Sequence, residues 1–259
     1  MPVPADIAQQ QALLHRLLIT RPVDADAPPL DEHVMAATER VLCAQYHVAD
    51  AASGAAFPTD AAALPTLADA NPTSPYPAAA RTCLWRGDIT RLRVDAIVNA
   101  ANAELLGCFQ PDHRCIDNVI HSVAGPRLRI ACARLKGRPA REGSCAVTSG
   151  AFGALPCAHV MHVVGPQVPR GARVTPAQRQ HLADCYVGAL AEAQRLGVRS
   201  LAVCCVATGL YGFPAAEAVP IALAACAAHT LDRLVFNVYT AQDHELYQVC
   251  GVCACKARQ

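Results

Sequence analysis

From Thr82 onward, short apolar or β-branched segments alternate with longer segments of helical periodicity. The predicted strands are Thr82–Arg86, Ala96–Ala100, Cys145–Ser149, Val160–Val164, Leu201–Val206 and Leu234–Tyr239. The predicted helices are Asp117–Arg134, Pro176–Leu196, Ala215–His229 and Gln242–Cys250. This alternation predicts a three-layer α/β/α domain with a mixed, largely parallel central sheet. Because ligands in such folds bind beyond the carboxyl ends of the strands, the loops after Ala100 and Val206 are the places to search for a site.

The residues before this domain differ from it in periodicity and composition. Apolar residues recur at helical spacing over Asp6–Ile19 and again from Asp31 to about Tyr46, which predicts two amphipathic helices. Between Asp50 and Ala80 the chain is rich in Ala, Pro, Ser, Thr and Asp, which indicates a linker or an irregular wrap. We therefore expect a helical extension and a Pro/Ala-rich linker over residues 1–79 and the main domain over residues 80–259.

Composition excludes several classes of function. The 22 Lys and Arg residues nearly balance the 21 Asp and Glu residues, so no basic field is available to bind nucleic acid. The longest apolar stretches fall well short of the roughly 20 residues needed to span a bilayer, so no membrane partner is expected. Fourteen cysteines without a recognisable signal peptide predict a reduced, cytoplasmic protein in which most thiols are small core residues. A monomer is favoured, although nothing in the sequence specifies the oligomeric state.

Two polar segments follow predicted strands. Gly87–Thr90, with the sequence Gly-Asp-Ile-Thr, places Asp88 in a turn at the sheet edge, where it serves either a ligand or the turn itself. Asn99–Asn102, with the sequence Asn-Ala-Ala-Asn, follows the next predicted strand. Its carboxamides can donate and accept hydrogen bonds to a sugar, or they can form an ordinary Asn turn.

A third segment carries metal-binding residue types. Cys108, His113 and Cys115 lie within eight positions on a loop just before a predicted helix. Two thiolates and an imidazole suit tetrahedral zinc, and three protein ligands leave the fourth position open, as in catalytic sites. The alternative is a pair of unligated core thiols.

A glycine-containing loop, Val206–Pro214, connects a predicted strand to the following helix. Gly209 and Gly212 would let backbone amides surround an anion near the helix N-terminus. An ordinary turn between a strand and a helix would have the same composition.

In this order, the segments Gly87–Thr90, Asn99–Asn102, Ile116–His121 and Ala207–Pro214 resemble those of macrodomains, the α/β modules that bind ADP-ribose. Ordinary macrodomains have a run of glycines where this chain has Gly107–Cys115. That segment instead resembles the zinc-dependent branch of protein-ADP-ribose hydrolases, which also has a helical N-terminal extension. The resemblance is strong from Ala80 onward and weak before it.

The resemblance implies roles for the motif residues. Asp88 would bind the adenine amino group, Ile89 would contact the adenine through its backbone, and Asn102 would hold the distal ribose. The loop that wraps the diphosphate would consist of Ala207, Thr208, Gly209, Leu210, Tyr211, Gly212 and Phe213, with Gly209, Leu210, Tyr211 and Gly212 offering amides. For the outer face of the adenine, the candidates are Phe236, Tyr239 and Asp243.

For catalysis, the resemblance implies one zinc ion on Cys108, His113 and Cys115, with Asp117 near the scissile bond. His121 lies one helical turn after Asp117 and is a second catalytic candidate, although it could equally be a satisfied helix histidine. Asn102 completes the predicted catalytic set.

The predicted activity is zinc-dependent removal of mono-ADP-ribose from protein side chains, with acidic side chains expected, so the partners are ADP-ribose and a mono-ADP-ribosylated protein. The alternative is a module that binds ADP-ribose without cleaving it and contains a structural zinc. A second metal site at Cys250, Cys253 and Cys255 is disfavoured, since no histidine accompanies them.

Overall fold

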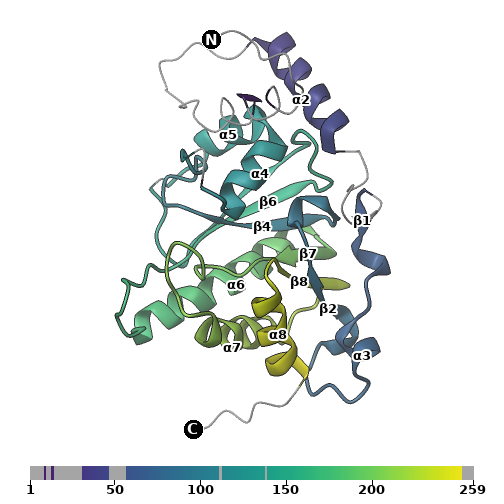
Figure 1. The fold of residues 1–259 in the computed structure, drawn as a ribbon, viewed down its shortest axis with the longest axis vertical. Helices are drawn as coiled ribbons and strands as arrows, with labels where there is room; N and C mark the ends of the chain where they lie inside the picture. The colour runs from purple at the N-terminus through teal and green to yellow at the C-terminus, as the bar shows by residue number, and fades with distance from the viewer. Residues whose placement is uncertain are drawn as a thin grey trace.

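A six-stranded sheet forms the centre of the protein (Figure 1). The computed structural model describes residues 31–46, 57–110, 113–137 and 139–252, together with Gln9, Leu13 and Leu14. The strands lie in the order β2-β8-β7-β4-β6-β5, and every neighbouring pair is parallel except β5 and β6. Their bounds are β2 (Thr82–Arg86), β4 (Ala96–Ala101), β5 (Cys145–Ser149), β6 (His159–Val164), β7 (Ser200–Val203) and β8 (Arg233–Val238).

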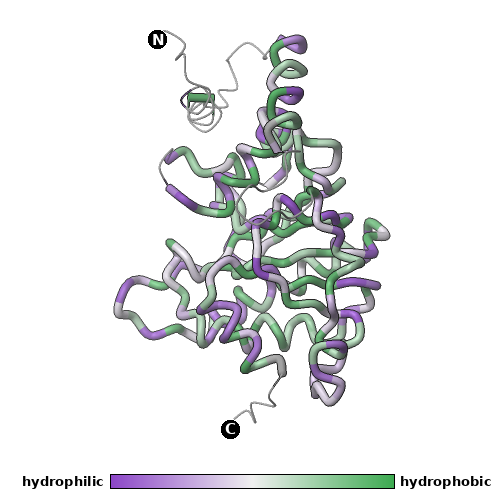
Figure 2. Tube along the Cα trace, turned by 45° about the vertical axis from the view of Figure 1, so that its right-hand side comes forward, coloured by the Kyte–Doolittle hydropathy of each residue, from purple (hydrophilic) through white to green (hydrophobic). Residues whose placement is uncertain are grey.

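Helices cover both faces of this sheet (Figure 1). On one face lie α4 (Ile116–Ala124) and α5 (Pro126–Ala133), and on the other lie α6 (Pro176–Leu196), α7 (Ala215–Cys226) and α8 (Ala241–Val252). The central strands are almost entirely buried, as expected for parallel strands covered on both faces. Figure 2 shows hydrophobic stretches of the chain running through the middle of the molecule. The predicted three-layer fold with its mixed sheet is confirmed.

The predicted helix Asp117–Arg134 is wrong in one respect, because the structure divides it into α4 and α5. Gly125 takes a left-handed φ of 70° and Pro126 follows as the first residue of α5. Glycine adopts this backbone conformation without a steric penalty, and proline lacks the N–H that a continuous helix would use. The pair Gly125-Pro126 therefore ends one helix and starts the next.

The predicted helix from Asp31 to about Tyr46 is confirmed as α2 (Glu32–Tyr46). It packs on the α4–α5 corner, where Leu42 is buried against Gly125 and Arg127 pairs with both Glu32 and Glu39. The predicted first helix, Asp6–Ile19, falls outside the described residues apart from the isolated positions.

Residues 57–81 form an irregular wrap over the β2 edge of the sheet and not a free linker. The wrap contains β1 (Thr59–Asp60), η1 (Ala61–Ala63), α3 (Leu67–Ala70) and η2 (Ala79–Arg81), and β1 pairs with β3 (Leu92–Arg93), which follows η3 (Ile89–Arg91). Tyr76 anchors the wrap, because its buried ring packs on Phe236 and its hydroxyl donates to the Leu223 carbonyl at 3.1 Å. The boundary at residues 79 and 80 stays a prediction.

Two expectations from composition can be followed in the structure. Every cysteine in the described part of the chain is free, and most are buried or half-buried, as expected for small core residues. Within the same residues, no helix is long and apolar enough to cross a bilayer.

Candidate functional site

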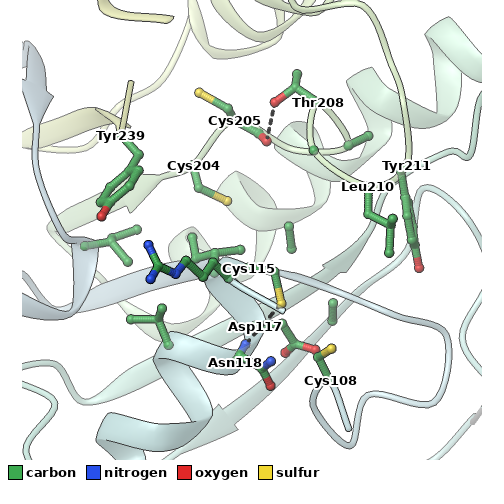
Figure 3. Close-up of a pocket in the computed structure, with 18 of the residues that line it drawn as sticks. Cys108, Cys115, Asp117, Asn118, Cys204, Cys205, Thr208, Leu210, Tyr211 and Tyr239 are labelled. Carbon is green, nitrogen blue, oxygen red and sulfur yellow. Dashed lines mark hydrogen bonds between the residues drawn. The ribbon is translucent and has the colours of Figure 1, made fainter. Parts of the chain in front are cut away.

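A cavity of about 940 Å³ opens at the carboxyl ends of β2, β4, β7 and β8 (Figure 3). This is the edge of the sheet where the sequence predicts a ligand, and the volume lies in the usual range for small-molecule sites. The predicted site residues that line the cavity are Asp88, Ile89, Asn102, Cys108, His113, Cys115, Asp117, Ala207, Thr208, Gly209, Leu210 and Tyr211. The fold therefore brings four separate motifs together around one space.

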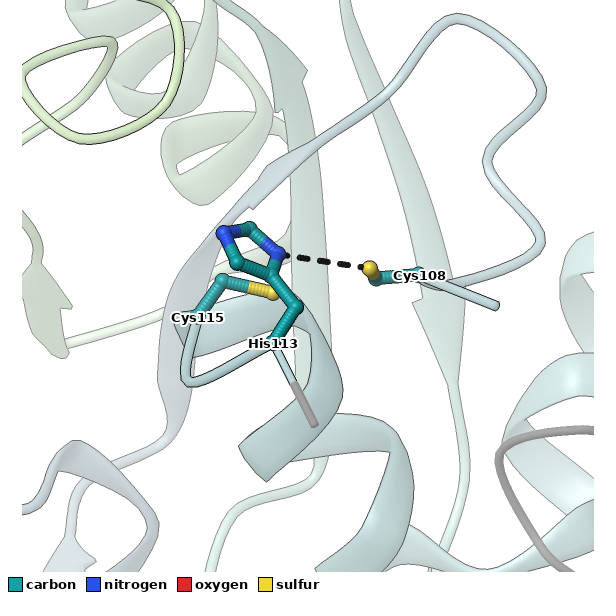
Figure 4. A group of neighbouring side chains, drawn as sticks. All are labelled: Cys108, His113 and Cys115. Atoms are coloured by element: carbon teal, nitrogen blue, oxygen red, sulfur yellow. Dashed lines mark hydrogen bonds between the residues drawn. The ribbon is translucent and has the colours of Figure 1, made fainter. Parts of the chain in front are cut away.

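The three predicted metal ligands lie together at the wall of the cavity (Figure 4). The ligand atoms of Cys108, His113 and Cys115 are all within 4.8 Å of one another, and Cys108 Sγ lies 3.5 Å from His113 Nδ1. Burial raises the pKa of Cys115 to about 12, while the Asn118 backbone N–H, 3.4 Å from its sulfur, acts in the opposite direction. A divalent cation would draw the proton from such a thiol, so the donor set fits zinc.

Asn118 braces this ligand loop from α4 and was not found in the sequence analysis. Its buried Nδ2 donates to the Gln110 carbonyl at 2.7 Å and to the His113 carbonyl at 2.8 Å. One amide thus ties both sides of the loop to the start of α4. Only the folded loop brings these carbonyls to Asn118, so the sequence carries no signal for this role.

We expect Asn118→Ala to weaken zinc binding by about 10- to 100-fold, because residues that orient metal ligands contribute this much to affinity. Competition with a chromogenic chelator measures the change. Ser122→Ala is the matched control, since Ser122 lies one turn further along α4 and donates to the Asn118 carbonyl without touching the loop. Equal zinc affinity in wild type and Asn118→Ala would contradict the bracing role.

Asp117 lies at the start of α4 beside the metal ligands, with its carboxylate directed toward Cys108 (Figure 3). Its Oδ1 accepts a 2.7 Å hydrogen bond from Asn99 Nδ2. Burial raises the pKa of Asp117 to about 6, and the Asn99 bond and the charge of Arg129 oppose that shift. The carboxylate is therefore held in one orientation and is poised to take or hold a proton near neutral pH.

His121, the second predicted catalytic candidate, does not line the cavity. Its ring is 3% exposed and lies under Gly107, where an added Cβ would approach the ring atoms to 3.0 Å. Burial holds the pKa of His121 well below its usual range, so the 3.5 Å approach of Nε2 to Asp117 Oδ1 is not an ion pair. His121 lies one helical turn after Asp117, and at that position its ring lies beneath the loop that carries the metal ligands and not at the cavity.

The loop after β7 exposes four consecutive backbone amides. Within the described residues, the N–H groups of Thr208, Gly209, Leu210 and Tyr211 donate no hydrogen bond, and all four residues line the cavity. Ala207 starts this loop with a φ of 65°, a conformation uncommon for residues other than glycine and found where function demands it. Such a row of free amides is suited to an anion.

Gly212 and Phe213 were predicted to belong to the loop that wraps the diphosphate, but their amides are bonded within the loop itself. The Gly212 amide donates to the Gly209 carbonyl and the Phe213 amide to the Ala207 carbonyl, both at 3.0 Å. The Phe213 side chain is buried in the core, and neither residue lines the cavity. These two residues close the loop, and the amides of residues 208–211 remain for a ligand.

Tyr186 of α6 holds the start of this loop from below. Its buried hydroxyl donates to the Cys204 carbonyl at 3.0 Å and accepts from the Val206 N–H at 3.2 Å. These contacts replace strand pairing after Val203, which is why β7 ends before the predicted Val206. Cys204 and Cys205, expected as packing residues within that strand, lie in this segment and line the cavity floor.

We expect Tyr186→Phe to weaken ligand binding and to lower the free energy of unfolding by about 1–3 kcal/mol, because a buried C=O and N–H lose their partner. Isothermal calorimetry with ADP-ribose and urea unfolding measure the two effects. Tyr76→Phe is the matched control, since its hydroxyl bonds a carbonyl far from the loop. Unchanged affinity in Tyr186→Phe would show that the loop keeps its shape without this anchor.

At the opposite end of the cavity, Asp88 caps η3. Its Oδ1 accepts from the Thr90 amide at 2.9 Å and from the Thr90 hydroxyl at 2.6 Å, so Oδ2 is available to a ligand. Three residues were predicted as candidates to cover the outer face of the adenine. Phe236 is buried in the core, whereas Tyr239 and Asp243 line the cavity. Asp243 accepts from Thr240 at the start of α8, and Tyr239 is 79% exposed. The free aromatic face therefore belongs to Tyr239 (Figure 3).

Asn102 lines the cavity and also holds its own loop. Its Oδ1 accepts from the Glu104 and Leu105 amides at 3.0 and 3.1 Å, and Nδ2 donates to the Gly107 carbonyl at 3.0 Å. The Asn turn that the sequence left as an alternative is thus present. One Nδ2 hydrogen remains for a sugar hydroxyl.

The chain is similar to known proteins both in sequence and in structure. The family model described as Macro domain matches residues 98–222. A solved macrodomain of Oceanobacillus iheyensis with ADP is 34% identical, with a TM-score of 0.55 over 64% of this chain and 86% of that one. The chain belongs to the macrodomain family. A solved Trypanosoma brucei macrodomain in complex with ADP-ribose is 29% identical and has a TM-score of 0.62 over 91% of this chain and 94% of that one.

Among curated proteins, a protein-ADP-ribose hydrolase of Staphylococcus aureus (strain MRSA252) is 40% identical over 173 residues, which are 64% of this chain and 64% of that protein. The chain spans less than two thirds of the length of the first curated relatives it matches. These relatives share the macrodomain with this chain, and their activity as whole proteins enters below as a proposal.

Two further residues of this macrodomain site went unnoticed in the sequence. Gly165 follows β6 and lies so close to the amide loop that an added Cβ would come within 2.8 Å of Ala207 Cβ. Asn237 of β8 lines the cavity and donates to the Gly87 carbonyl at 2.9 Å, which fixes the turn carrying Asp88. Both act through contacts between segments distant in sequence. The Cys250, Cys253 and Cys255 run gives no structural test, because Cys253 and Cys255 lie outside the described residues.

Proposed function

We propose that this macrodomain is a zinc-dependent protein-ADP-ribose hydrolase that removes mono-ADP-ribose from modified protein side chains and releases ADP-ribose. The observation that carries the proposal is the Cys108, His113 and Cys115 cluster, which opens into the same cavity as Asp117 and the loop of free amides. A metal site remote from the cavity would have no access to the substrate. The names of the curated relatives support hydrolysis, and the ADP and ADP-ribose complexes of the solved neighbours support the ligand.

In this proposal the ligand lies along the cavity with its adenine at Asp88. The free Oδ2 of Asp88 accepts a hydrogen bond from the adenine amino group, the Ile89 backbone contacts the base, and Tyr239 covers its outer face. The diphosphate lies on the amides of residues 208–211. Cavity-lining residues in the described chain include three carboxylates but only Arg114 as a permanent cation, so amides provide most of the anion binding.

The distal ribose then lies between Asn102, Asp117 and the metal ligands. Cys108, His113 and Cys115 would hold one zinc ion. When bound, zinc supplies a Lewis acid that polarises an oxygen and lowers the pKa of a coordinated water. Asn102 donates its remaining Nδ2 hydrogen to a ribose hydroxyl, and Asp117 orients the attacking water and takes its proton.

The chemistry of the leaving group favours a modified acidic side chain. A carboxylate leaves the ribose carbon without being protonated, because its conjugate acid has a pKa of about 4. The described lining residues place one carboxyl group, Asp117, beside the metal ligands, and a single group cannot serve as base and acid at the same step. Hydrolysis of an acyl-linked ADP-ribose requires only the base.

The alternative is a module that binds ADP-ribose without hydrolysing it and in which zinc merely holds the loop. Binding requires Asp88 and the amides of residues 208–211, but it does not require Asp117 beside an open three-ligand cluster. The test incubates the purified protein with a carrier mono-ADP-ribosylated on acidic residues and combines elemental analysis with detection of free ADP-ribose. Zinc with release of ADP-ribose supports the hydrolase, whereas tight binding with intact substrate supports the alternative.

A further inference from the structure

A chain of buried polar side chains lies behind Asp117, on the side away from the cavity. It runs from Asn99 of β4 through His162 of β6 to Thr148 of β5, and none of the three is more than 3% exposed. Asn99 is the link to the active site, since its Nδ2 donates to Asp117 Oδ1 at 2.7 Å. Buried polar groups on neighbouring strands require mutual hydrogen bonds, so the direction of each bond can be worked out.

The same Asn99 Nδ2 lies 3.2 Å from His162 Nδ1. An amide nitrogen can only donate, so His162 Nδ1 must accept, and the ring proton must lie on Nε2. His162 Nε2 then donates to the Thr148 hydroxyl at 3.0 Å. All three contacts are consistent with one tautomer of His162 and one orientation of the Asn99 amide. The reverse orientation would set Asn99 Oδ1 against the Asp117 carboxylate, acceptor against acceptor.

The surroundings keep His162 in this neutral form. The ring is completely enclosed, and burial lowers its pKa to about 4. The groups facing it are Asn99, Thr148, Cys132 Sγ at 3.5 Å from Nε2, and the neutral ring of His121 at a centroid distance of 6.2 Å. A protonated ring would lose the Nδ1 acceptor and set an Nδ1–H donor against the Asn99 Nδ2 donor.

The grouping of His121, Cys132 and His162, whose nitrogen and sulfur atoms lie within 4.8 Å, is for the same reason not a second metal site. A metal on His162 Nε2 would move the ring proton to Nδ1, where it would meet the Asn99 Nδ2 donor. Cys132 and His162 belong to a hydrogen-bonded interior, in contrast to the open ligands at the cavity.

We propose that His162 is a positioning residue for the hydrolytic reaction: its Nδ1 fixes the Asn99 amide, and Asn99 in turn fixes the carboxylate of Asp117 at the cavity. The inference rests on the proposed hydrolase function. Because the network touches only the rear oxygen of Asp117, it acts on turnover and leaves the adenine and diphosphate contacts alone.

The test compares His162→Leu, which removes the acceptor, with His162→Asn, whose Oδ1 can replace Nδ1. We expect His162→Leu to lower kcat by about 10- to 100-fold, since small displacements of a catalytic group have effects of this size, while the Kd for ADP-ribose changes less than about threefold. His162→Asn should recover most of the rate. Val123→Ala, a buried apolar truncation on the Asp117 helix, is the control for lost stability and should keep kcat at temperatures below its unfolding transition.

Nuclear magnetic resonance of the wild-type protein tests the geometry independently of activity. The ¹⁵N shifts of His162 should show the proton on Nε2, and the Asn99 carboxamide protons should exchange slowly in wild type and rapidly in His162→Leu. A proton on Nδ1 overturns the proposal, as does a parallel loss of kcat, ADP-ribose affinity and melting temperature in His162→Leu. Metal retained in Cys108→Ala and lost on adding Cys132→Ala overturns it as well.

The proposed function and this inference can fail separately. A wild-type protein that contains zinc and binds ADP-ribose but releases none from the modified carrier refutes the hydrolase, whatever the state of His162. Active wild type with an unaffected His162→Leu variant refutes only the positioning role. Should His162→Leu not fold, the wild-type spectra and the His162→Asn rate decide the question.

Discussion

Cys108→Ala and His113→Ala are each expected to abolish zinc binding at the proposed site and to lower ADP-ribose release by more than about 100-fold, the upper end of the effect of losing a supporting residue around a metal. Each substitution leaves two ligands, and the remaining pair cannot hold zinc in a tetrahedral site against a chelator. Elemental analysis measures the zinc content. On the same preparation, the assay measures the ADP-ribose that is released from an acyl-linked substrate. The fold should survive, because both side chains lie at the cavity wall and outside the main core.

Cys226→Ala is the matched control for these variants. Cys226 is a fully buried thiol of α7 and does not line the cavity, so its loss tests the removal of sulfur without the removal of a ligand. Affinity for free ADP-ribose should fall less than turnover in the ligand variants, since Asp88 and the amides of residues 208–211 are intact. Full hydrolysis by a metal-free variant would refute zinc dependence. Unfolding on metal loss without a kinetic defect would show that zinc only holds the loop together.

Asp117→Asn is expected to lower turnover by about 10²- to 10⁴-fold, the usual contribution of a positioned general base. The variant keeps the shape of the side chain, and its carbonyl oxygen can still accept from Asn99 Nδ2. What is lost is the ability to take a proton from water. Single-turnover rates and ADP-ribose calorimetry should show a defect in the chemical step with binding nearly unchanged.

Stability provides the control for Asp117→Asn. The pKa of Asp117 is raised to about 6 in the folded protein by burial, so the ionised carboxylate disfavours folding at pH 7 relative to the solvated group in the unfolded chain. A neutral amide removes that cost. We expect urea unfolding at pH 7 to show equal or higher stability for Asp117→Asn, and a large loss of stability would mean that the rate defect reflects a damaged fold.

The strand and helix pattern could be predicted well because it depends on local periodicity. The bounds predicted for β2, β5 and α6 agree with the structure residue for residue, since each has a clear apolar period and a clear end signal. The error in β7 arose where a distant contact replaced the local pattern, whereas the predicted helix Asp117–Arg134 missed a local signal, the pair Gly125-Pro126. β7 ends early because Tyr186 takes the hydrogen bonds of Cys204 and Val206.

The candidate site also has parts that local sequence predicts and parts that it does not. The metal ligands lie within eight positions, and the amide loop is one continuous segment, so sequence spacing was enough to find both. The position of His121 outside the cavity could not be predicted, because a helical repeat shows which residues share a face but not what covers that face. Here the covering group is the ligand loop at Gly107.

The sequence by itself determined the order of the elements, the macrodomain motifs and the cluster of potential zinc ligands, because these depend on neighbours along the chain. Tertiary structure alone decided which residues support them: Asn118 across the metal loop, Gly165 under the amide loop, and His162 behind Asp117 through Asn99. The physical reason is that directed hydrogen bonds and close backbone contacts join groups that only folding brings together. For Asn118 the partners lie in the folded loop just before its helix, and for Asn99 and His162 they meet only when the parallel strands assemble side by side.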